Sequence, residues 1–376
     1  MRQRALQAIL LVHAIEQTDL AGDALSLEDR EHASREAAEG RPLPVAPGAP
    51  VPLSGDSERF LARRAEVLLA RLRVRSPGVD RVLAAAARPG VLDRSILLLG
   101  FVLGFGAAFA DGSRIDIFAY SLIGLVLWNL IVYLVLAVRT FASPGPVSQS
   151  AGGVAAQDAA AARRDGFFRR WLARLYANRV RARIDTLITH SIGFNAPLAP
   201  GLRRFAADWW EVGRPLFRER ARRLLHLAAI LAAAGLMAGY GLRGWILRQS
   251  AGWATTVFGP ASAHSALVTL YGPASAVSGV PIPSAQGVQA LAWTGPTAGG
   301  GPAGQWLYLI DWTALLYIVL PRLIAVVVTT VSLWRRSASL HTPPSFAGYL
   351  GAVLRSLAPA PEPPSPAPPP AGSSAS

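Results

Sequence analysis

The 376-residue sequence contains no cysteine, which excludes thiol catalysis, a disulfide scaffold, iron–sulfur clusters and cysteine zinc sites. It contains no lysine either, so all 37 basic residues are arginines. Charged residues make up only 16% of the chain, against about 25% in a typical soluble protein. A chain of this length could not cover a soluble surface with so little charge, so we expect a membrane protein. Arginine in place of lysine, with abundant alanine, glycine and proline, is typical of a GC-rich bacterial coding sequence.

The net charge of +14 is concentrated in one part of the chain. Residues 1–93 hold 13 arginines and 13 acidic residues, whereas residues 139–223 hold 16 arginines and six acidic residues. A basic loop between apolar segments is typical of a cytoplasmic loop that faces anionic lipid headgroups. This distribution favours the lipid bilayer as the partner and argues against nucleic acid.

Four apolar segments approach the about 20 residues that a membrane-spanning helix needs. They are residues 95–110, 115–138, 224–242 and one span within 306–334. Only residues 111–114 separate the first two, which predicts a tight transmembrane hairpin. Arginines are concentrated in residues 139–223 and at Arg335 and Arg336, so the positive-inside rule places both termini in the cytoplasm. We therefore expect a multi-pass protein of a bacterial inner membrane.

These features predict an all-α fold: a four-span transmembrane helical bundle with cytoplasmic amphipathic helices and a re-entrant or interfacial outer segment. Seven segments follow from the spans. They are a cytoplasmic N-terminal helical region (1–93), the transmembrane hairpin (94–138), a basic cytoplasmic loop with an amphipathic helix (139–223), the third span (224–242), an apolar outer segment (243–305), the fourth span (306–336) and a cytoplasmic, Pro-rich disordered tail (337–376).

The N-terminal region has helix signals and no recognisable signal peptide. Residues 6–15 predict an amphipathic helix. Ser26 and Asp29 have the spacing of a capping box, which predicts a second helix that extends to Ala38. In residues 58–74, apolar side chains recur on one face with arginines opposite, as in a helix that packs on a neighbour or lies on the membrane surface. That apolar face comprises Phe60, Leu61, Val67, Leu68 and Leu72.

The basic loop contains a stretch, residues 167–175, in which aromatic side chains alternate with arginines. Such a composition also occurs where proteins bind single-stranded nucleic acid. Because this stretch lies between two spans, we expect it at the inner leaflet instead.

Arg322 follows Pro321 in the middle of the fourth span, where a charge costs about 2.5–3.5 kcal/mol on insertion scales. Pro321 has no N–H, so a carbonyl near Tyr317 loses its usual partner and is free to accept from the guanidinium. Counted from the outer face, Arg322 and Asn129 differ in depth by about 6 Å, which an arginine can reach. The predicted intramembrane polar cluster comprises Arg322, Asn129, Tyr317 and Asp311.

Two interpretations of this cluster stay open. The functional one is a gate or an anionic substrate site. The structural one is a hydrogen-bond clasp, or an Arg322 side chain that extends to the inner surface.

Two small-residue motifs predict close helix contacts. Gly100 and Gly104 are spaced as GxxxG in the first span, and Gly235 and Gly239 are spaced in the same way in the third. We expect these glycines to pack helices within one bundle. Contacts between copies in a homo-oligomer are the alternative.

The outer segment is almost uncharged after Arg248 and is interrupted by glycine and proline. It is too apolar for a free loop and too broken for a standard span. We expect short helices around residues 262–271 and 284–291 that lie in the outer interface, re-enter between spans or form a lid. Its candidate functional residues are Trp253, Thr255, Thr256 and His264.

Common enzyme signatures are missing from the sequence. It has no GxxxxGK[ST], HExxH or GxSxG motif, and none of its six histidines forms an i, i+4 pair. No residue is therefore nominated as catalytic or as a metal ligand, and we expect neither an enzyme nor a cofactor.

Several stretches together resemble a known family. They are RALQAILLVHAIEQTD, FLARRAEVLLARL, LIGLVLWNLIVYLVL, RARRLLHLAAILAAAGLMAGYGLRGW, AGWATTVF and LYIVLPRLIA. In these stretches the chain resembles bacterial multi-pass inner-membrane proteins catalogued as domain of unknown function 2868. The resemblance implies no activity. It implies a partner, a membrane-associated GTPase-domain protein encoded beside such genes.

Two functional hypotheses follow. The first is a membrane scaffold or receptor whose regions 1–93 and 139–223 dock a cytoplasmic partner such as that GTPase. The second is a channel or transporter in which Arg322 and the outer segment line the path.

Overall fold

The computed structural model divides the chain into two compact units. Unit 1 comprises Met1–Ala87, Arg179–Gly213 and Ser337–Ser376, and unit 2 comprises Arg88–Asn178 and Arg214–Arg336. The structure describes residues 3–39, 53, 55–87, 91–109, 114–118, 127, 129–131, 178, 182, 185–187, 189, 197–255, 259–295 and 299–357. The predictions for residues 167–175, most of 119–138, Thr256 and the Pro-rich tail from residue 358 fall outside these ranges.

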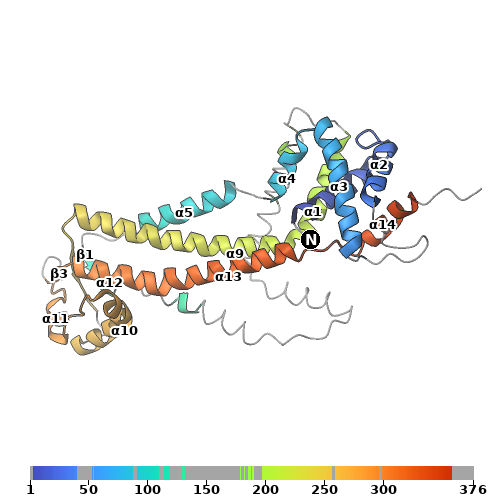
Figure 1. Cartoon of the computed structure of the whole chain (residues 1–376). Coiled ribbons are helices and arrows are strands. Elements are labelled where there is room, and N and C mark those ends of the chain that lie inside the picture. Colours follow the sequence, from blue (N-terminus) through green and yellow to red (C-terminus); the bar gives the residue numbers. More distant parts are fainter. Residues whose placement is uncertain are drawn as a thin grey trace, which may run out of the picture. The chain divides into compact units, whose positions relative to one another are not determined.

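Unit 1 is a helical domain built from three separate parts of the chain (Figure 1). Its N-terminal part supplies α1 (Gln3–Thr18), α2 (Leu27–Ala38), α3 (Gly55–Arg75) and α4 (Val79–Ala87). The middle part supplies the beginning of α9 (Leu198–Ile246), and the C-terminal part supplies α14 (Phe346–Arg355).

Helix α1 is the centre of unit 1. Every residue from Leu6 to Ile15 is buried, including Gln7 and His13. The prediction of an amphipathic helix at residues 6–15 is therefore wrong, because α1 is enclosed on all sides. The enclosing helices include α3, α14 and α9, whose Gly201 lies so close that a Cβ there would be 2.9 Å from the Ile15 backbone.

Helix α2 begins with the predicted capping box and ends at Ala38. Ser26 Oγ accepts from the Asp29 N–H at 3.1 Å, and Asp29 Oδ2 accepts from the Ser26 N–H at 3.2 Å. Asp29 also pairs with Arg71 and Arg75 of α3. Burial pushes the pKa of Asp29 upward, but the bonds from Arg71 and Ser26 and the charge of Arg75 outweigh it and hold the pKa at about 2.

Helix α3 packs its apolar face inside unit 1, where Phe60, Leu61, Leu68 and Leu72 are buried. The prediction that its arginines lie on the opposite face is wrong for Arg64, which is only 4% exposed. Its partners come from other helices and are described with the candidate site.

Helix α9 is one continuous helix of 49 residues, about 73 Å long at 1.5 Å per residue. Its first part carries a stripe of buried side chains, Leu202, Phe205 and Trp209, at helical spacing. Trp209 Nε1 donates to the Ala86 carbonyl at 3.1 Å, which ties α9 to the end of α4. The end of the predicted basic loop is therefore part of a folded domain, and the predicted third span is the second part of the same helix.

Long apolar helices form the body of unit 2 (Figure 1). Helix α5 (Val91–Ala107) lies along α9, and α12 (Gly304–Ala314) continues through a π-helical turn (Leu315–Val319) into α13 (Leu320–Ala338). Two helices, Leu198–Ile246 and Gly304–Ala338, are long and apolar enough to cross a membrane. Large apolar side chains point outward from α13, as lipid-facing residues do: Leu323, Ile324, Val327, Val328 and Val331.

Helices α5 and α9 approach each other closely through their glycines. A Cβ at Gly100 would lie 2.7 Å from the Ala228 carbonyl oxygen, and one at Gly104 would overlap the Ala232 carbonyl. From the other side, Gly235 faces the Phe101 carbonyl and Gly239 faces Phe105 and Ala108. Both GxxxG motifs thus serve the same contact within one chain, and backbone carbonyls fill the positions that side chains would take.

The outer segment folds into a compact cap at one end of α9 and α12 (Figure 1). This outer cap comprises α10 (Pro260–Ser278), α11 (Ala285–Ala290) and the strands β1 (Arg114–Asp116), β2 (Ser250–Gly252) and β3 (Gly301–Pro302). The strand order is β1-β2-β3, with β1 parallel to β2 and β2 antiparallel to β3.

The mostly helical fold is consistent with the all-α prediction, and the sheet is a small addition of three short strands. The sheet corrects one boundary, because residues 115 and 116 lie in a strand instead of beginning the second span. Ile115 and Ile117 are buried in the cap, where the Ile117 carbonyl accepts from the Tyr271 hydroxyl at 2.9 Å. The short helices expected around 262–271 and 284–291 coincide with α10 and α11.

The glycine contact gives a prediction with a matched control in the same helix. Gly104→Ala should lower the free energy of unfolding by about 1–3 kcal/mol, because the new Cβ overlaps the Ala232 carbonyl and forces α5 and α9 apart. Gly106→Ala should have no such cost, because no atom lies within 4 Å of that Cβ position. Unfolding of the purified chain in a detergent titration measures both, and equal stability of the two variants would contradict the packing.

Candidate functional site

Arg322 and Asn129 form a polar pair between apolar segments of unit 2. Arg322 Nη2 donates to Asn129 Oδ1 at 2.7 Å, and Arg322 Nε donates to the same oxygen at 3.1 Å. Asn129 is 1% exposed and lies in a helical stretch that includes residues 130 and 131. The amide oxygen therefore receives a charge-assisted, two-armed contact from the guanidinium.

The π-helical turn lies directly before Pro321. In this turn the Leu320 N–H bonds to the Leu315 carbonyl, five residues back. A proline in a regular α-helix would press its ring against the carbonyl four residues earlier, which belongs to Tyr317. The wider π turn gives the ring space, and it rotates the following helix relative to α12. Arg322 therefore lies just after a distorted turn of the helix.

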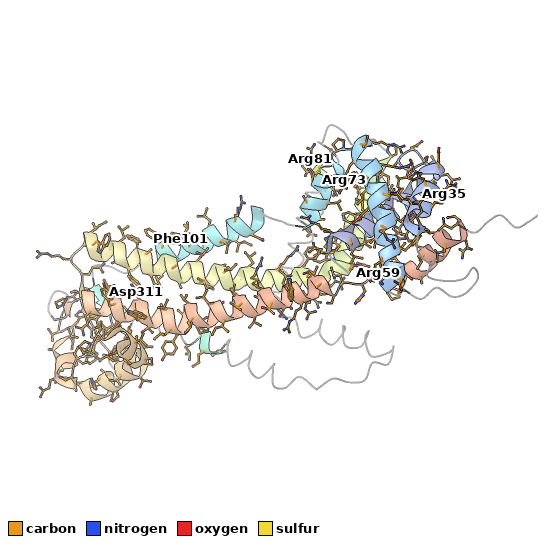
Figure 2. All side chains as sticks on the ribbon, viewed as in Figure 1. Arg35, Arg59, Arg73, Arg81, Phe101 and Asp311 are labelled. Carbon is orange, nitrogen blue, oxygen red and sulfur yellow. The ribbon has the colours of Figure 1, made fainter. Side chains whose placement is uncertain are left out.

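The other predicted members of the cluster do not join the pair. Among the described residues, Arg322 makes its hydrogen bonds to Asn129, and none goes to the Tyr317 carbonyl. Asp311 lies on α12 near the outer cap (Figure 2), eleven residues before Arg322 and so about 16 Å away along the helix. Asp311 Oδ1 is buried without a hydrogen-bond partner among the described residues.

The predicted outer residues are parts of the cap. Trp253 is buried, and its Nε1 donates to the Val288 carbonyl at 2.7 Å while its ring meets Phe118 edge-on. Thr255 and His264 are partly exposed, and His264 lies on α10. The structure therefore gives Trp253 a role in holding the cap together.

Arg243 is a buried residue that the sequence reasoning missed. It is 3% exposed near the end of α9, where its guanidinium donates to the Ala108 carbonyl just past the end of α5. It also lies over the Phe109 ring at 5.7 Å, and the Gln249 amide oxygen is placed to accept from it at 3.0 and 3.1 Å. One arginine thus joins α5, α9 and the start of β2. Its position beside an apolar segment was the available sequence signal.

A second missed cluster holds unit 1 together. Arg64 of α3 binds Glu16 of α1 at 2.6 Å, Ser34 of α2 at 2.8 Å and the Tyr349 hydroxyl of α14 at 2.7 Å. The Tyr349 hydroxyl also bonds Glu16, and burial together with the Glu16 charge raises its pKa. The His13 ring lies 4.3 Å from Phe346 and 4.6 Å from Tyr349. This arginine cluster therefore ties the C-terminal helix to the N-terminal helices.

The described residues contain no group of three or more His, Asp or Glu side chains that could hold a metal ion. The clusters that they do contain are clamps between helices. Their charged groups are matched by partners on neighbouring helices, so the arrangement supplies positioning and buried charge.

These features define a mostly helical protein with two helices long and apolar enough to cross a membrane, which indicates membrane association. Residues 158–365 match the model of the family described as Protein of unknown function (DUF2868). Because the match covers more than half of the chain, the protein belongs to this family, and the sequence-based assignment is confirmed. Searches of curated proteins and of solved structures gave no match.

The Arg322–Asn129 pair predicts energetic coupling. Asn129→Leu should be more destabilising than Arg322→Leu, because it leaves a cation among apolar side chains. The double variant should recover about 1.5–3 kcal/mol relative to the sum of the two single variants, as expected for a hydrogen bond to a charged group. Detergent-titration unfolding of the four proteins measures this coupling.

Arg248→Leu is the matched control for this cycle, because Arg248 is exposed and its replacement removes the same charge. Its effect should add to that of Asn129→Leu within about 0.5 kcal/mol. Additive effects for the Arg322 pair as well would contradict a direct interaction.

Proposed function

We propose that this protein is a multi-pass scaffold or receptor of the bacterial inner membrane, which carries unit 1 on its cytoplasmic side and docks a soluble partner there. The observation that carries the proposal is the composition of unit 1. It is one domain assembled from Met1–Ala87, Arg179–Gly213 and Ser337–Ser376, which precede, separate and follow the apolar segments.

A single packed domain supports a definite topology. The Arg64 cluster joins the N-terminal and C-terminal parts, and the middle part packs on α1 through Gly201 and on α4 through Trp209. A bilayer cannot pass through such a core, so all three parts belong on one side. The chain then crosses an even number of times between consecutive parts. The apolar part of α9 and Gly304–Ala338 supply two crossings after Gly213. Helix α5 and the apolar residues 119–138 supply two before Arg179.

The distribution of arginine supports a cytoplasmic location for unit 1. The arginine-rich residues 139–223 lie between the two pairs of crossings, and Arg335 and Arg336 follow the last one. Positive loops remain in the cytoplasm. The outer cap, nearly free of charge after Arg248, then belongs on the opposite face.

The surface of unit 1 supports a docking role. Exposed arginines project from its helices, among them Arg35, Arg73 and Arg81 (Figure 2). Three large apolar side chains are also exposed on its α1–α2 loop and helices: Leu20 at 90%, Leu27 at 70% and Val74 at 85%. Exposed apolar groups beside charges are typical of transient protein interfaces. The family resemblance suggests a membrane-associated GTPase as the partner.

A channel or transporter is the second candidate function, and the Arg322–Asn129 pair favours it because buried cations in spans often mark ion or substrate paths. The pair ranks second here because Asn129 engages the guanidinium at two nitrogens, as a structural clasp does. An anion flux into proteoliposomes that Arg322→Gln abolishes would reverse this order.

The topology is testable with single cysteines, since the chain has none of its own. Glu28→Cys, Ala207→Cys and Arg355→Cys place one thiol at an exposed position in each part of unit 1, and Ser262→Cys places one in the cap. In intact spheroplasts an impermeant maleimide should label only the Ser262 variant, and the other three should react after permeabilisation. A difference in labelling among the three unit 1 positions would contradict their location on the same side of the membrane.

The docking role is testable by affinity capture of the tagged full chain from native membranes, with GDP or with a non-hydrolysable GTP analogue. Mass spectrometry should find a stoichiometric soluble partner whose recovery depends on the nucleotide. Arg64→Met should lose the partner, because it leaves Glu16 buried without its counter-charge and loosens unit 1. Arg59→Met should retain it, since Arg59 is exposed on the same helix.

Two outcomes would count against docking by unit 1. One is a wild-type chain that is recovered alone under both nucleotides. The other is equal recovery of the partner from the Arg64 and Arg59 variants.

A further inference from the structure

Helices α9 and α13 carry a dense arginine cluster next to their apolar stretches. In unit 2, residues 214–223 of α9 contain five arginines and one glutamate, and α13 adds Arg335 and Arg336 in its last turns. The glutamate is Glu219.

Glu219 joins the two helices and holds two of the arginines. Its side chain is 7% exposed, and Oε1 lies 3.0 Å from Arg222 Nη1 and 3.6 Å from Arg336 Nε. One carboxylate thus faces two guanidinium groups. The side chains of Arg222 and Arg336 are 38% and 53% exposed, so a ligand can reach both.

Helices α9 and α13 carry further cations here, and α13 also carries exposed apolar side chains. Arg223 and Arg335, the sequence neighbours of Arg222 and Arg336, have no ion-pair partner among the described residues. Trp334 is 70% exposed, as tryptophans at a membrane interface are. Val331 and Val328, one and two turns before Trp334, are also exposed and begin the apolar surface of the helix.

We propose that Arg222 and Arg336, positioned by Glu219, bind the phosphodiester headgroup of an anionic phospholipid in the cytoplasmic leaflet. The inference deepens the proposed function and rests on its orientation. A guanidinium fork matches two phosphate oxygens, and two forks fixed by one carboxylate form a preorganised receptor. The acyl chains extend along the exposed valines of α13.

The apolar surface is what selects a lipid over other phosphate or acidic ligands. A soluble phosphate ester would use the arginines but not Trp334, Val331 or Val328. An acidic protein segment would need a polar surface around the arginines, whereas an apolar helix adjoins them on α13. A phospholipid uses both parts of the site.

Native mass spectrometry of the delipidated full chain in detergent tests the site. Phosphatidylglycerol should bind at least about tenfold more tightly than phosphatidylcholine with the same acyl chains, and this preference should weaken with salt. Arg222→Gln/Arg336→Gln should reduce phosphatidylglycerol affinity about tenfold or more, because two charge-assisted contacts are lost. Its affinity for phosphatidylcholine should not change.

Three further proteins make the result interpretable. Arg59→Gln/Arg73→Gln removes the same charge from exposed positions of unit 1 and should leave lipid binding unchanged. Adding Glu219→Gln to the Arg222/Arg336 variant removes the buried unpaired carboxylate and should give the same loss in a stable chain. Arg223→Gln/Arg335→Gln, at exposed or half-buried positions, should weaken binding without disturbing Glu219.

Several results would overturn the proposal. They are an equal loss in the Arg59/Arg73 control, no loss in the Arg222/Arg336 variants, or equally tight binding of glycerol phosphate or inorganic phosphate. Capture of an acidic soluble protein that depends on these arginines while lipid binding does not would assign the cluster to a protein partner instead.

Cysteine labelling separates this inference from the proposed function. If unit 1 labels from outside, the orientation fails, and the headgroup site is no longer cytoplasmic. If the labelling is as expected but the arginine variants bind phosphatidylglycerol normally, only the lipid site fails.

Discussion

Burial of the Arg64 guanidinium is the interaction on which unit 1 depends. A buried charge is tolerated only when each of its donors has a partner, and here the partners come from α1, α2 and α14. Tyr349, near the end of the chain, thereby binds residues from its beginning. The domain is complete only after the apolar segments between these parts have been placed, so its assembly is coupled to the topology of the whole chain.

Unit 2 is held together differently, because apolar side chains gain little free energy when contacts with lipid are replaced by contacts with one another. Close contact and polar clamps must hold such helices together. Gly104 and Gly235 let the backbones of α5 and α9 meet, Arg243 closes the end of α5, and Arg322 reaches Asn129. A side chain at either glycine would overlap the facing backbone, and loss of either arginine would leave an unmatched polar atom. These contacts therefore hold the helices in defined positions.

Local signals in the sequence predicted those features that depend on neighbouring residues. The Ser26–Asp29 box needs only residues three apart, and the approach of Arg322 to Asn129 followed from counting depth along two spans. The strands were not predictable, because Ser250–Gly252 and Gly301–Pro302 lack residues with strand preference and are paired by the surrounding cap. The burial of α1 and of Arg64 could not be predicted either, because it depends on helices that are distant in sequence.

The contrast between the two polar clusters bears on where function resides. Asn129 already accepts two hydrogen bonds from the Arg322 guanidinium, and the pair lies among apolar segments. The pair therefore has few groups that could bind a ligand. Arg222 and Arg336, which contact Glu219, are accessible to solvent. An accessible charge on an apolar helix can recruit a ligand, whereas a buried, matched charge maintains a shape. By this reasoning we propose that unit 1 and the arginine cluster carry the interactions with other molecules, whereas the buried clamps hold the helices of unit 2 together.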